Sequence, residues 1–241
     1  MLTALDVLKR RGLAGQQLSE LPASSIEDAI AEAMEDKTGN ASVKLLADVN
    51  AADLITIPAD KTLVLDLNGH AFAYTSAVAG DAMITNNGTL TVKDSGLNGK
   101  ITYSYTGTPD TSYGKGNYTI FNKGTLTLES GIVENTTAAM SHASYAINTD
   151  TGATVTINGG KFEVTNAVGT RALTSHVIYA KGSASKLTIN GGDFAQNIAN
   201  GGGSSVICPA GATIKIYGGN YYHAPVSDVQ SGCFQNYMGS G

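Results

Sequence analysis

The sequence predicts an all-β fold, a single-stranded right-handed parallel β-helix (a solenoid) that follows a short α-helical N-terminal segment. The main observation is a motif in which apolar and polar residues alternate before a glycine turn, clearest in residues 153–162, 185–194 and 212–221. Six copies follow one another at intervals of 25, 36, 29, 32 and 27 residues, and repeats of this length are typical of solenoids. We expect one apolar residue of each copy to stack inside: Leu65, Leu90, Leu126, Val155, Leu187 and Ile214.

Each repeat is expected to contain three short strands. The alternation of Val155, Thr156 and Ile157 has the period of a strand with one buried face. A second apolar run precedes each motif, and the glycines after it turn the chain because glycine tolerates positive φ. An apolar aromatic residue after the turn is expected to point back inside, at Phe72, Phe162, Phe194 and Tyr221. The alternative is a β-sandwich with glycine turns, although sandwich strands seldom reuse one motif.

The longest interval holds an insertion of roughly residues 102–116, rich in Tyr, Gly, Thr and Ser. A solenoid accepts such an insertion at one corner without disturbing its other coils. Aromatic side chains here are expected either to stack on a sugar or to form a contact between subunits. These candidate glycan-contacting residues are Tyr103, Tyr105, Tyr113 and Tyr118.

The start of the chain is expected to be helical. Residues 1–11 contain a capping box and are followed by a glycine, and Leu2, Leu5 and Leu8 lie close to one helical face. This first helix is either a frayed terminus or a docking segment that folds against a partner.

A second helix is predicted over about residues 25–36, where Ile30 belongs to an apolar stripe. Such a helix can cover the open end of a solenoid. The chain is therefore divided into residues 1–40 (a helical attachment and capping segment), 41–222 (the parallel β-helix) and 223–241 (a C-terminal cap or tail).

Composition narrows the range of partners. The chain of 241 residues has a net charge of −5, a pI near 5.3 and 15% charged residues, which argues against nucleic acid because that partner needs a basic stripe. No apolar run reaches about 18 residues, so no membrane span is expected, and the N-terminus has no features of a secretory signal. Cys208 lies in a strand run and is expected in the core. A bridge from it to Cys233 is the minor alternative.

The opening coils carry a family resemblance. Residues 43–72, VKLLADVNAADLITIPADKTLVLDLNGHAF, and the INGGxF turns resemble pectate-lyase-like right-handed β-helix proteins, which are abundant in surface and phage proteins of gut bacteria. The resemblance covers roughly residues 41–222 and concerns core and turn positions, so it implies the fold more strongly than a function. The leading helical segment is similar to the attachment regions of bacteriophage fibre, spike and head-decoration proteins.

Enzymes with this fold place carboxylates together on one sheet face, as acid and base or as calcium ligands. We compared two columns of equivalent outward positions, and neither puts two acids on adjacent rungs. The first column reads Asp66, Thr91, Thr127, Thr156, Thr188 and Lys215, and the second reads Asn68, Lys93, Glu129, Asn158, Asn190 and Tyr217. The histidines lack metal-ligand spacing, with His70 and His176 expected at turns or strand edges. We expect no catalytic residues, no metal and no cofactor.

Two further patterns in these columns have alternative explanations. Asn158 and Asn190 occupy equivalent turns one rung apart and are expected to form a hydrogen-bonded asparagine ladder, with a glycan-contacting pair as the alternative. The threonine column suggests ice binding as a minor alternative, although threonine is simply a good strand residue.

The function expected from these features is that of a structural or adhesive bacteriophage virion protein: a head fibre, a capsid decoration or the base of a tail fibre, attached through its N-terminal segment. The partners would be capsid or tail proteins, with a homotrimer as the oligomeric state and a host-surface glycan as a further ligand. The expected location is the virion, with the host cytoplasm during assembly. A carbohydrate-binding or carbohydrate-degrading tailspike is the main alternative, and a bacterial surface adhesin a minor one.

Overall fold

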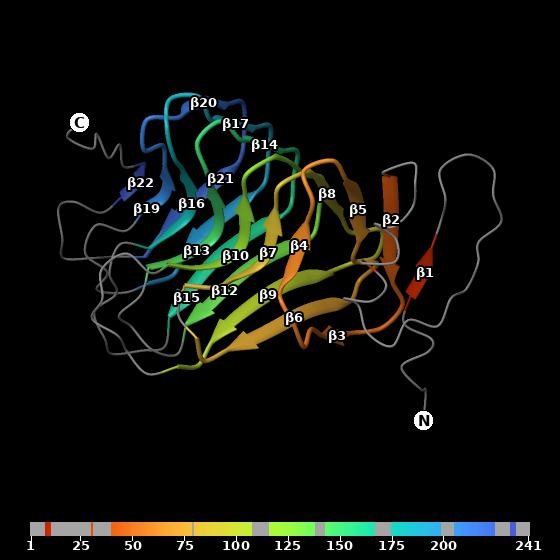
Figure 1. Ribbon diagram of the computed structural model, residues 1–241. Helices are drawn as coiled ribbons and strands as arrows, with labels where there is room; N and C mark the ends of the chain where they lie inside the picture. Colours follow the sequence, from red (N-terminus) through yellow and green to blue (C-terminus); the bar gives the residue numbers. More distant parts are fainter. Residues whose placement is uncertain are drawn as a thin grey trace.

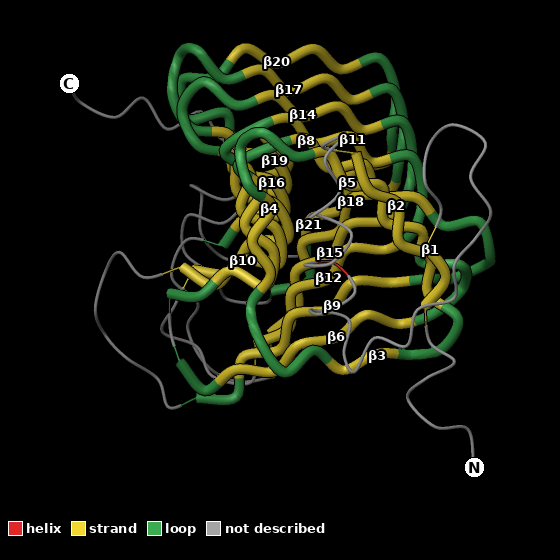
Figure 2. The backbone as a smooth tube through the Cα atoms, turned by 45° about the vertical axis from the view of Figure 1, so that its right-hand side comes forward, coloured by secondary structure: helices red, strands yellow, loops and turns green. Residues whose placement is uncertain are grey.

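The protein is a right-handed parallel β-solenoid built from three sheets. Its computed structural model describes residues 8–10, 30, 40–78, 80–107, 116–137, 143–166, 175–198, 205–224 and 232–234. Along the solenoid the chain adds one strand to each sheet in turn, so that the three sheets enclose a roughly triangular interior (Figures 1 and 2). Neighbouring strands pair in parallel, except that β1 runs antiparallel to β2. The predicted solenoid is confirmed, and the β-sandwich alternative is wrong.

The sheets are named here A, B and C. In spatial order, sheet A contains β1 (Leu8–Arg10), β2 (Asn40–Leu45), β5 (Thr62–Asp66), β8 (Thr89–Lys93), β11 (Thr125–Leu128), β14 (Thr154–Ile157), β17 (Lys186–Ile189) and β20 (Thr213–Ile216). Sheet B contains β3 (Val49–Asn50), β6 (Ala71–Ser76), β9 (Lys100–Tyr105), β12 (Ile132–Thr137), β15 (Lys161–Asn166), β18 (Asp193–Gln196) and β21 (Asn220–His223). Sheet C contains β4 (Ile55–Ile57), β7 (Ala82–Asn86), β10 (Gly116–Asn122), β13 (Ala143–Thr149), β16 (His176–Ala180), β19 (Ser205–Cys208) and β22 (Gly232–Phe234).

The glycine turns hold sheets A and B at a fixed corner. Gly160 and Gly192, which precede β15 and β18, have φ of 101° and 114°, a region that side chains disfavour. A Cβ at Gly160 would lie 2.6 Å from the carbonyl oxygen of Gly131 on the preceding rung. Both the backbone conformation and the close stacking of rungs therefore require glycine here.

Stacked columns of side chains fill the interior. Leu90, Leu126, Val155 and Leu187 are paired rung to rung and are at most 1% exposed. The aromatic residues predicted to point inside also form a column, in which Phe162 stacks on Phe194 at 4.9 Å and Phe194 on Tyr221 at 5.0 Å. Burial of apolar side chains throughout this core is the main favourable contribution to folding, at about 2 kcal/mol for each one that is fully buried.

The predicted register of the first repeat is wrong by two residues. Leu63, and not Leu65, pairs with Leu90, while Leu65 pairs with Val92 in the second inward column. A shift of two residues leaves the alternation of a strand unchanged, so the hydrophobic pattern alone cannot distinguish the two registers. Ile214, at the other end of the column, is only partly buried, because β20 is the outermost of the described strands of sheet A.

The corner between sheets C and A contains buried asparagines. The Nδ2 of Asn86 donates to the Oδ1 of Asn122 at 2.7 Å and to the carbonyl of Thr125 at 2.9 Å. The Nδ2 of Asn122 in turn donates to the carbonyl of Thr154 at 3.0 Å. These bonds satisfy the Nδ2 groups of both asparagines inside a packed corner, where an unpaired donor would cost about 1–3 kcal/mol.

At the N-terminal end, Leu8–Arg10 form strand β1 and not the last turn of the helix expected over residues 1–11. Leu8 pairs with Leu45 and Arg10 with Val43, so β1 uses the free backbone groups at the edge of β2. An open sheet edge is a strong template for pairing and outweighs the weak helical propensity of so short a segment. The rest of residues 1–11 lies outside the described residues.

Ile30 is helical and 4% exposed, and it packs in the main core cluster, as its place in the predicted apolar stripe requires. The remainder of the second predicted helix lies outside the described residues. The strands of the solenoid begin at Asn40 and continue to His223, and β22 adds a further strand from within the segment predicted as a cap or tail.

Candidate functional site

The residues predicted for docking divide into two groups. Leu2 and Leu5 lie outside the described residues. Leu8 belongs to β1 and pairs with Leu45 of β2, so its backbone is already engaged within the chain.

The predicted glycan-contacting tyrosines do not form one surface. Tyr103 and Tyr105 are 0% and 3% exposed, and both belong to β9, which places them in the core and not in a loop. The alternation Ile101, Tyr103, Tyr105 explains this placement, because every second residue of a strand faces the same side. Thr102 likewise belongs to β9, so the insertion starts later than predicted. Tyr113 lies outside the described residues.

Tyr118 belongs to an aromatic cluster on sheet C. Its ring stacks on Phe121 and on Tyr145, with centroids 5.3 Å apart in each case. On the next strand, His176 and Tyr179 stack at 5.5 Å and contact the ring of Tyr145. Of these five rings, only Tyr118 was predicted as a glycan contact. Tyr118, Tyr145 and His176 pair in one column across three successive strands, and Phe121 and Tyr179 pair with Asn148 in a second column.

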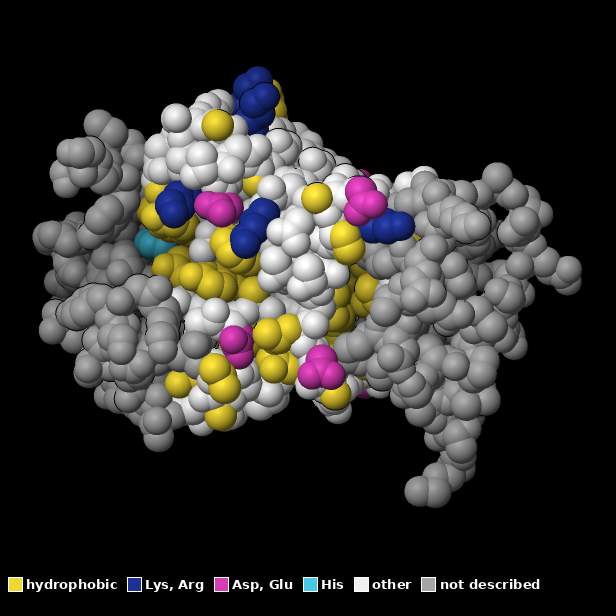
Figure 3. Space-filling model, in the orientation of Figure 1, with side chains coloured by type: hydrophobic (Ala, Val, Ile, Leu, Met, Phe, Trp, Pro, Cys, Tyr) yellow, Lys and Arg dark blue, Asp and Glu magenta, His cyan; other side chains and the backbone are white. Residues whose placement is uncertain are grey.

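This cluster lies on the outer face of sheet C. Thr119, between Tyr118 and Phe121, turns inward and donates from its hydroxyl to the carbonyl of Glu134 on β12 at 2.6 Å. Tyr118, the residue next to it, therefore points to the other face, where it stacks on the partly exposed Phe121 and hydrophobic side chains gather (Figure 3). Lys123 places its Nζ 4.8 Å from the centroid of Phe121, a cation–π contact. An aromatic face with a nearby cation can stack on the apolar face of a sugar ring.

Burial controls the ionisation of the cluster. It raises the pKa of the Tyr118 and Tyr145 phenols, so both keep their protons at neutral pH. It lowers the pKa of His176 to about 3, so the imidazole is neutral. The Nδ1 of His176 lies 2.7 Å from the Ser205 hydroxyl and accepts from the Ser205 N–H at 3.2 Å. His176 is thus a strand-edge residue, as predicted, held within the fold by Ser205.

Sheet B brings two carboxylates onto adjacent rungs. Glu134 of β12 pairs directly with Glu163 of β15, and both side chains are less than one-fifth exposed. Neighbouring strands lie about 4.8 Å apart. The two columns compared in the sequence belong to sheet A and its following turn, so they missed this pair. Aligning the strands that begin with Ile132-Val133-Glu134 and Lys161-Phe162-Glu163 would have revealed it.

Each of these carboxylates has its own cation. The Oε2 of Glu134 lies 3.4 Å from Lys100 Nζ and accepts from the Thr102 hydroxyl at 2.9 Å. The Oε2 of Glu163 lies 2.8 Å from Lys161 Nζ, and its Oε1 accepts from Asn197 at 3.2 Å. Ion pairs with added hydrogen bonds on neighbouring strands stabilise the sheet. The same side chains also offer polar groups to a ligand.

The outer face of sheet A is lined with threonine. Thr91, Thr127, Thr156 and Thr188 pair in one column, as predicted. Asp66 does not belong to it: Val64 pairs with Thr91, and Asp66 pairs with Lys93. The error is the same two-residue shift that displaced Leu65.

The asparagine ladder is confirmed. The Nδ2 of Asn190 donates to the Oδ1 of Asn158 at 2.7 Å, and the Nδ2 of Asn158 donates to the Oε2 of Glu129 at 3.0 Å. The asparagines therefore use each other as partners along the corner, as the structural explanation of this pair requires.

Metal binding, membrane insertion and disulfide formation each need particular groups in the described part of the chain. No group of three or more His, Cys, Asp or Glu side chains there is placed to hold a metal ion. No helix in the described part of the chain is long and apolar enough to cross a bilayer. Cys208 is buried in the core, as predicted, and Cys233 is half-buried; the two cysteines are not joined by a disulfide.

Comparison with known proteins returned no matching family model, no matching curated protein and no matching solved structure. The class that the structure defines is that of a three-sheeted parallel β-solenoid protein.

Proposed function

We propose that this protein is a non-enzymatic structural or adhesive component of a larger assembly. The observation that carries the proposal is the continuity of the three ladders, in which every rung is hydrogen-bonded to the next along the axis. Such a solenoid is a stiff rod whose length is set by the number of repeats, which suits a spacer or fibre element.

Within this class we propose a bacteriophage virion as the assembly, where the chain would serve as a head fibre, a capsid decoration or the base of a tail fibre. The resemblance of its opening coils to phage β-helix proteins supports this choice. Capsid or tail proteins would be its partners, the virion its final location and the host cytoplasm its location during assembly. The threonine column of sheet A is uncharged from Thr91 to Thr188, so it needs little desolvation and would allow three solenoids to pack side by side as a homotrimer.

We propose that attachment occurs through the N-terminal segment. Because β1 pairs with β2, two deletions of different length should have different effects. Deletion of residues 1–7 removes Leu2 and Leu5 but keeps β1, so the solenoid should melt at the parent temperature while incorporation into virions is lost. Deletion of residues 1–20 also removes β1 and should lower the melting temperature, because the edge of β2 becomes unpaired. Normal incorporation of the first variant would overturn attachment by these residues.

A second candidate function is glycan binding or cleavage, which two observations favour. The aromatic cluster around Tyr145 offers stacking surfaces. Glu134 and Glu163 lie on adjacent rungs, whose spacing of about 4.8 Å is close to the roughly 5 Å between the two carboxyl groups of retaining glycosidases. A panel of bacterial capsular and plant polysaccharides, with and without calcium, tests this candidate. We expect no depolymerisation. Turnover lost in Glu134→Gln and Glu163→Gln, but kept in the control Glu129→Gln, would establish the enzyme instead.

A further inference from the structure

The far end of the solenoid is open. Strands β20, β21 and β22 are the outermost strands of sheets A, B and C, so each is paired on one side only among the described strands. Ile216 and Phe234 belong to inward columns, yet they are 40% and 55% exposed, whereas Ile189 and Ile207 directly beneath them are fully buried. The cross-section of the core is therefore exposed at this end.

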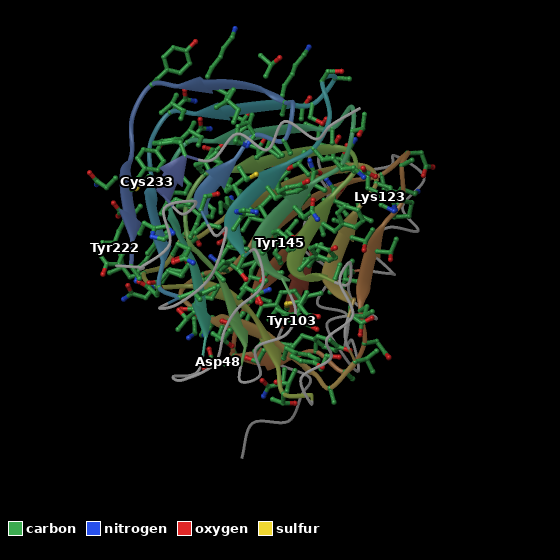
Figure 4. The ribbon with its side chains drawn as sticks, turned by 90° about the vertical axis from the view of Figure 1, so that its left-hand side faces the viewer. Asp48, Tyr103, Lys123, Tyr145, Tyr222 and Cys233 are labelled. Carbon is green, nitrogen blue, oxygen red and sulfur yellow. The ribbon has the colours of Figure 1, made fainter. Side chains whose placement is uncertain are left out.

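Aromatic side chains enlarge the apolar area at the rim. Tyr217 and Tyr222 are 71% and 54% exposed. Tyr222 of β21 and Cys233 of β22 are both labelled in Figure 4, which views the molecule from this end. With Phe234 they offer roughly 400 Å² of accessible side-chain area per copy, against the about 800 Å² per partner of a standard interface. Backbone groups of the three open strands and the partly buried Ile214 and Tyr221 add to this area.

The opposite end of the rod is different. β1 pairs antiparallel with β2 and covers the edge of sheet A, and Ile30 packs into the core. Head-to-tail stacking of two copies would have to displace β1. The matching free end on a second copy is thus the same end, formed by β20, β21 and β22.

We propose that this end binds the same end of a second copy, related by a two-fold axis perpendicular to the solenoid axis. That rotation reverses the direction in which the chain circles the axis, so open strands of the two copies meet antiparallel and can continue the ladders. The charges allow the contact. Among the described residues of this last rung, Lys215 is the single lysine and no residue is acidic, so few charges need to be desolvated.

The test is the mass of the whole chain in solution, measured by light scattering across the micromolar range. The parent should contain an even number of chains. Ile216→Lys should halve the mass, because each copy would bring a charge into the apolar contact. Tyr222→Lys, on the outer face where folding does not depend on it, should do the same. Leu97→Lys is the matched control: Leu97 is 84% exposed in the turn between β8 and β9, so its replacement should leave the mass unchanged.

Two results would overturn the proposal: an odd number of chains in the parent, or a mass that neither substitution at the open end changes. Residues 235–241 are a competing occupant. If deleting them turns an odd assembly into an even one, they cover the end and the proposal is wrong. The mass should be halved whether the parent is a dimer or a hexamer of two paired trimers. The outcome therefore does not depend on the proposed lateral trimer or on the virion function.

Discussion

Asp66 and Lys93 lie opposite each other on β5 and β8, with the Nζ of Lys93 3.8 Å from the Oδ2 of Asp66. The Oδ1 of Asp66 also accepts from the N–H groups of Asn68 at 3.0 Å and Ser95 at 2.9 Å. The carboxylate thus joins two consecutive turns, and it fixes the register that the hydrophobic pattern left open.

Asp66→Asn is expected to destabilise the fold by about 1.5–3 kcal/mol at pH 7, the range for hydrogen bonds to a charged group. Burial opposes ionisation of Asp66, but the hydrogen bonds from Ser95 and Asn68 and the charge of Lys93 outweigh it, so its pKa is lowered. A lowered pKa means that this stability is present above the unfolded value of about 3.9 and is lost as pH falls through the folded value. Chemical denaturation at pH 7 and pH 2 checks this. A difference between parent and variant that stays constant would contradict it.

His176 should make the stability of the fold sensitive to acid at higher pH than Asp66 does. Its pKa is lowered to about 3 by burial, so between pH 6.5 and 3 the unfolded chain binds a proton that the folded chain does not. Stability should therefore fall as pH drops through this window, by a limit on the order of 5 kcal/mol at pH 3. His176→Phe keeps the stacking with Tyr145 and Tyr179 but cannot titrate, so its stability should depend less on pH. Parallel curves for parent and variant would show that His176 is not the sensitive group.

Val155→Asp should destabilise the solenoid by several kcal/mol, because it buries an unpaired charge at a fully buried position. Thr156→Asp is the matched control, since Thr156 is the next residue and lies on the outer, half-buried face of the same strand. Thermal melts of the two variants test the assignment of faces. Equal melting temperatures would mean that Val155 is not stacked inside.

Asn158→Asp should cost more than Asn190→Asp. The first change places a carboxylate beside Glu129 and removes a donor, whereas the second removes only the donor to Asn158. Both sites are exposed, so we expect about 1 kcal/mol or less in each case, with a difference that shrinks in high salt. A difference of opposite sign would mean that the ladder does not extend to Glu129.

The solenoid itself could be predicted from the sequence because its repeat couples two periods, the alternation around Val155 and the return of the glycine turn. The same alternation runs through β9 and would have placed Tyr103 and Tyr105 inside. The Tyr-, Gly-, Thr- and Ser-rich composition of residues 102–116 instead predicted a loop. Glu134 and Glu163 could have been aligned on the third strand of each repeat. Strand β1 could not be predicted, since its pairing depends on the free edge of β2 and on no pattern within Leu8–Arg10.

The central claim, that the chain is a built-in part of a virion, is tested most directly by quantifying it in virions purified on a density gradient. The proposal predicts a fixed copy number per virion that survives high-salt washing, with no release of reducing sugar or unsaturated product from polysaccharides. Absence from the virions, together with depolymerisation that Glu134→Gln abolishes, would contradict it.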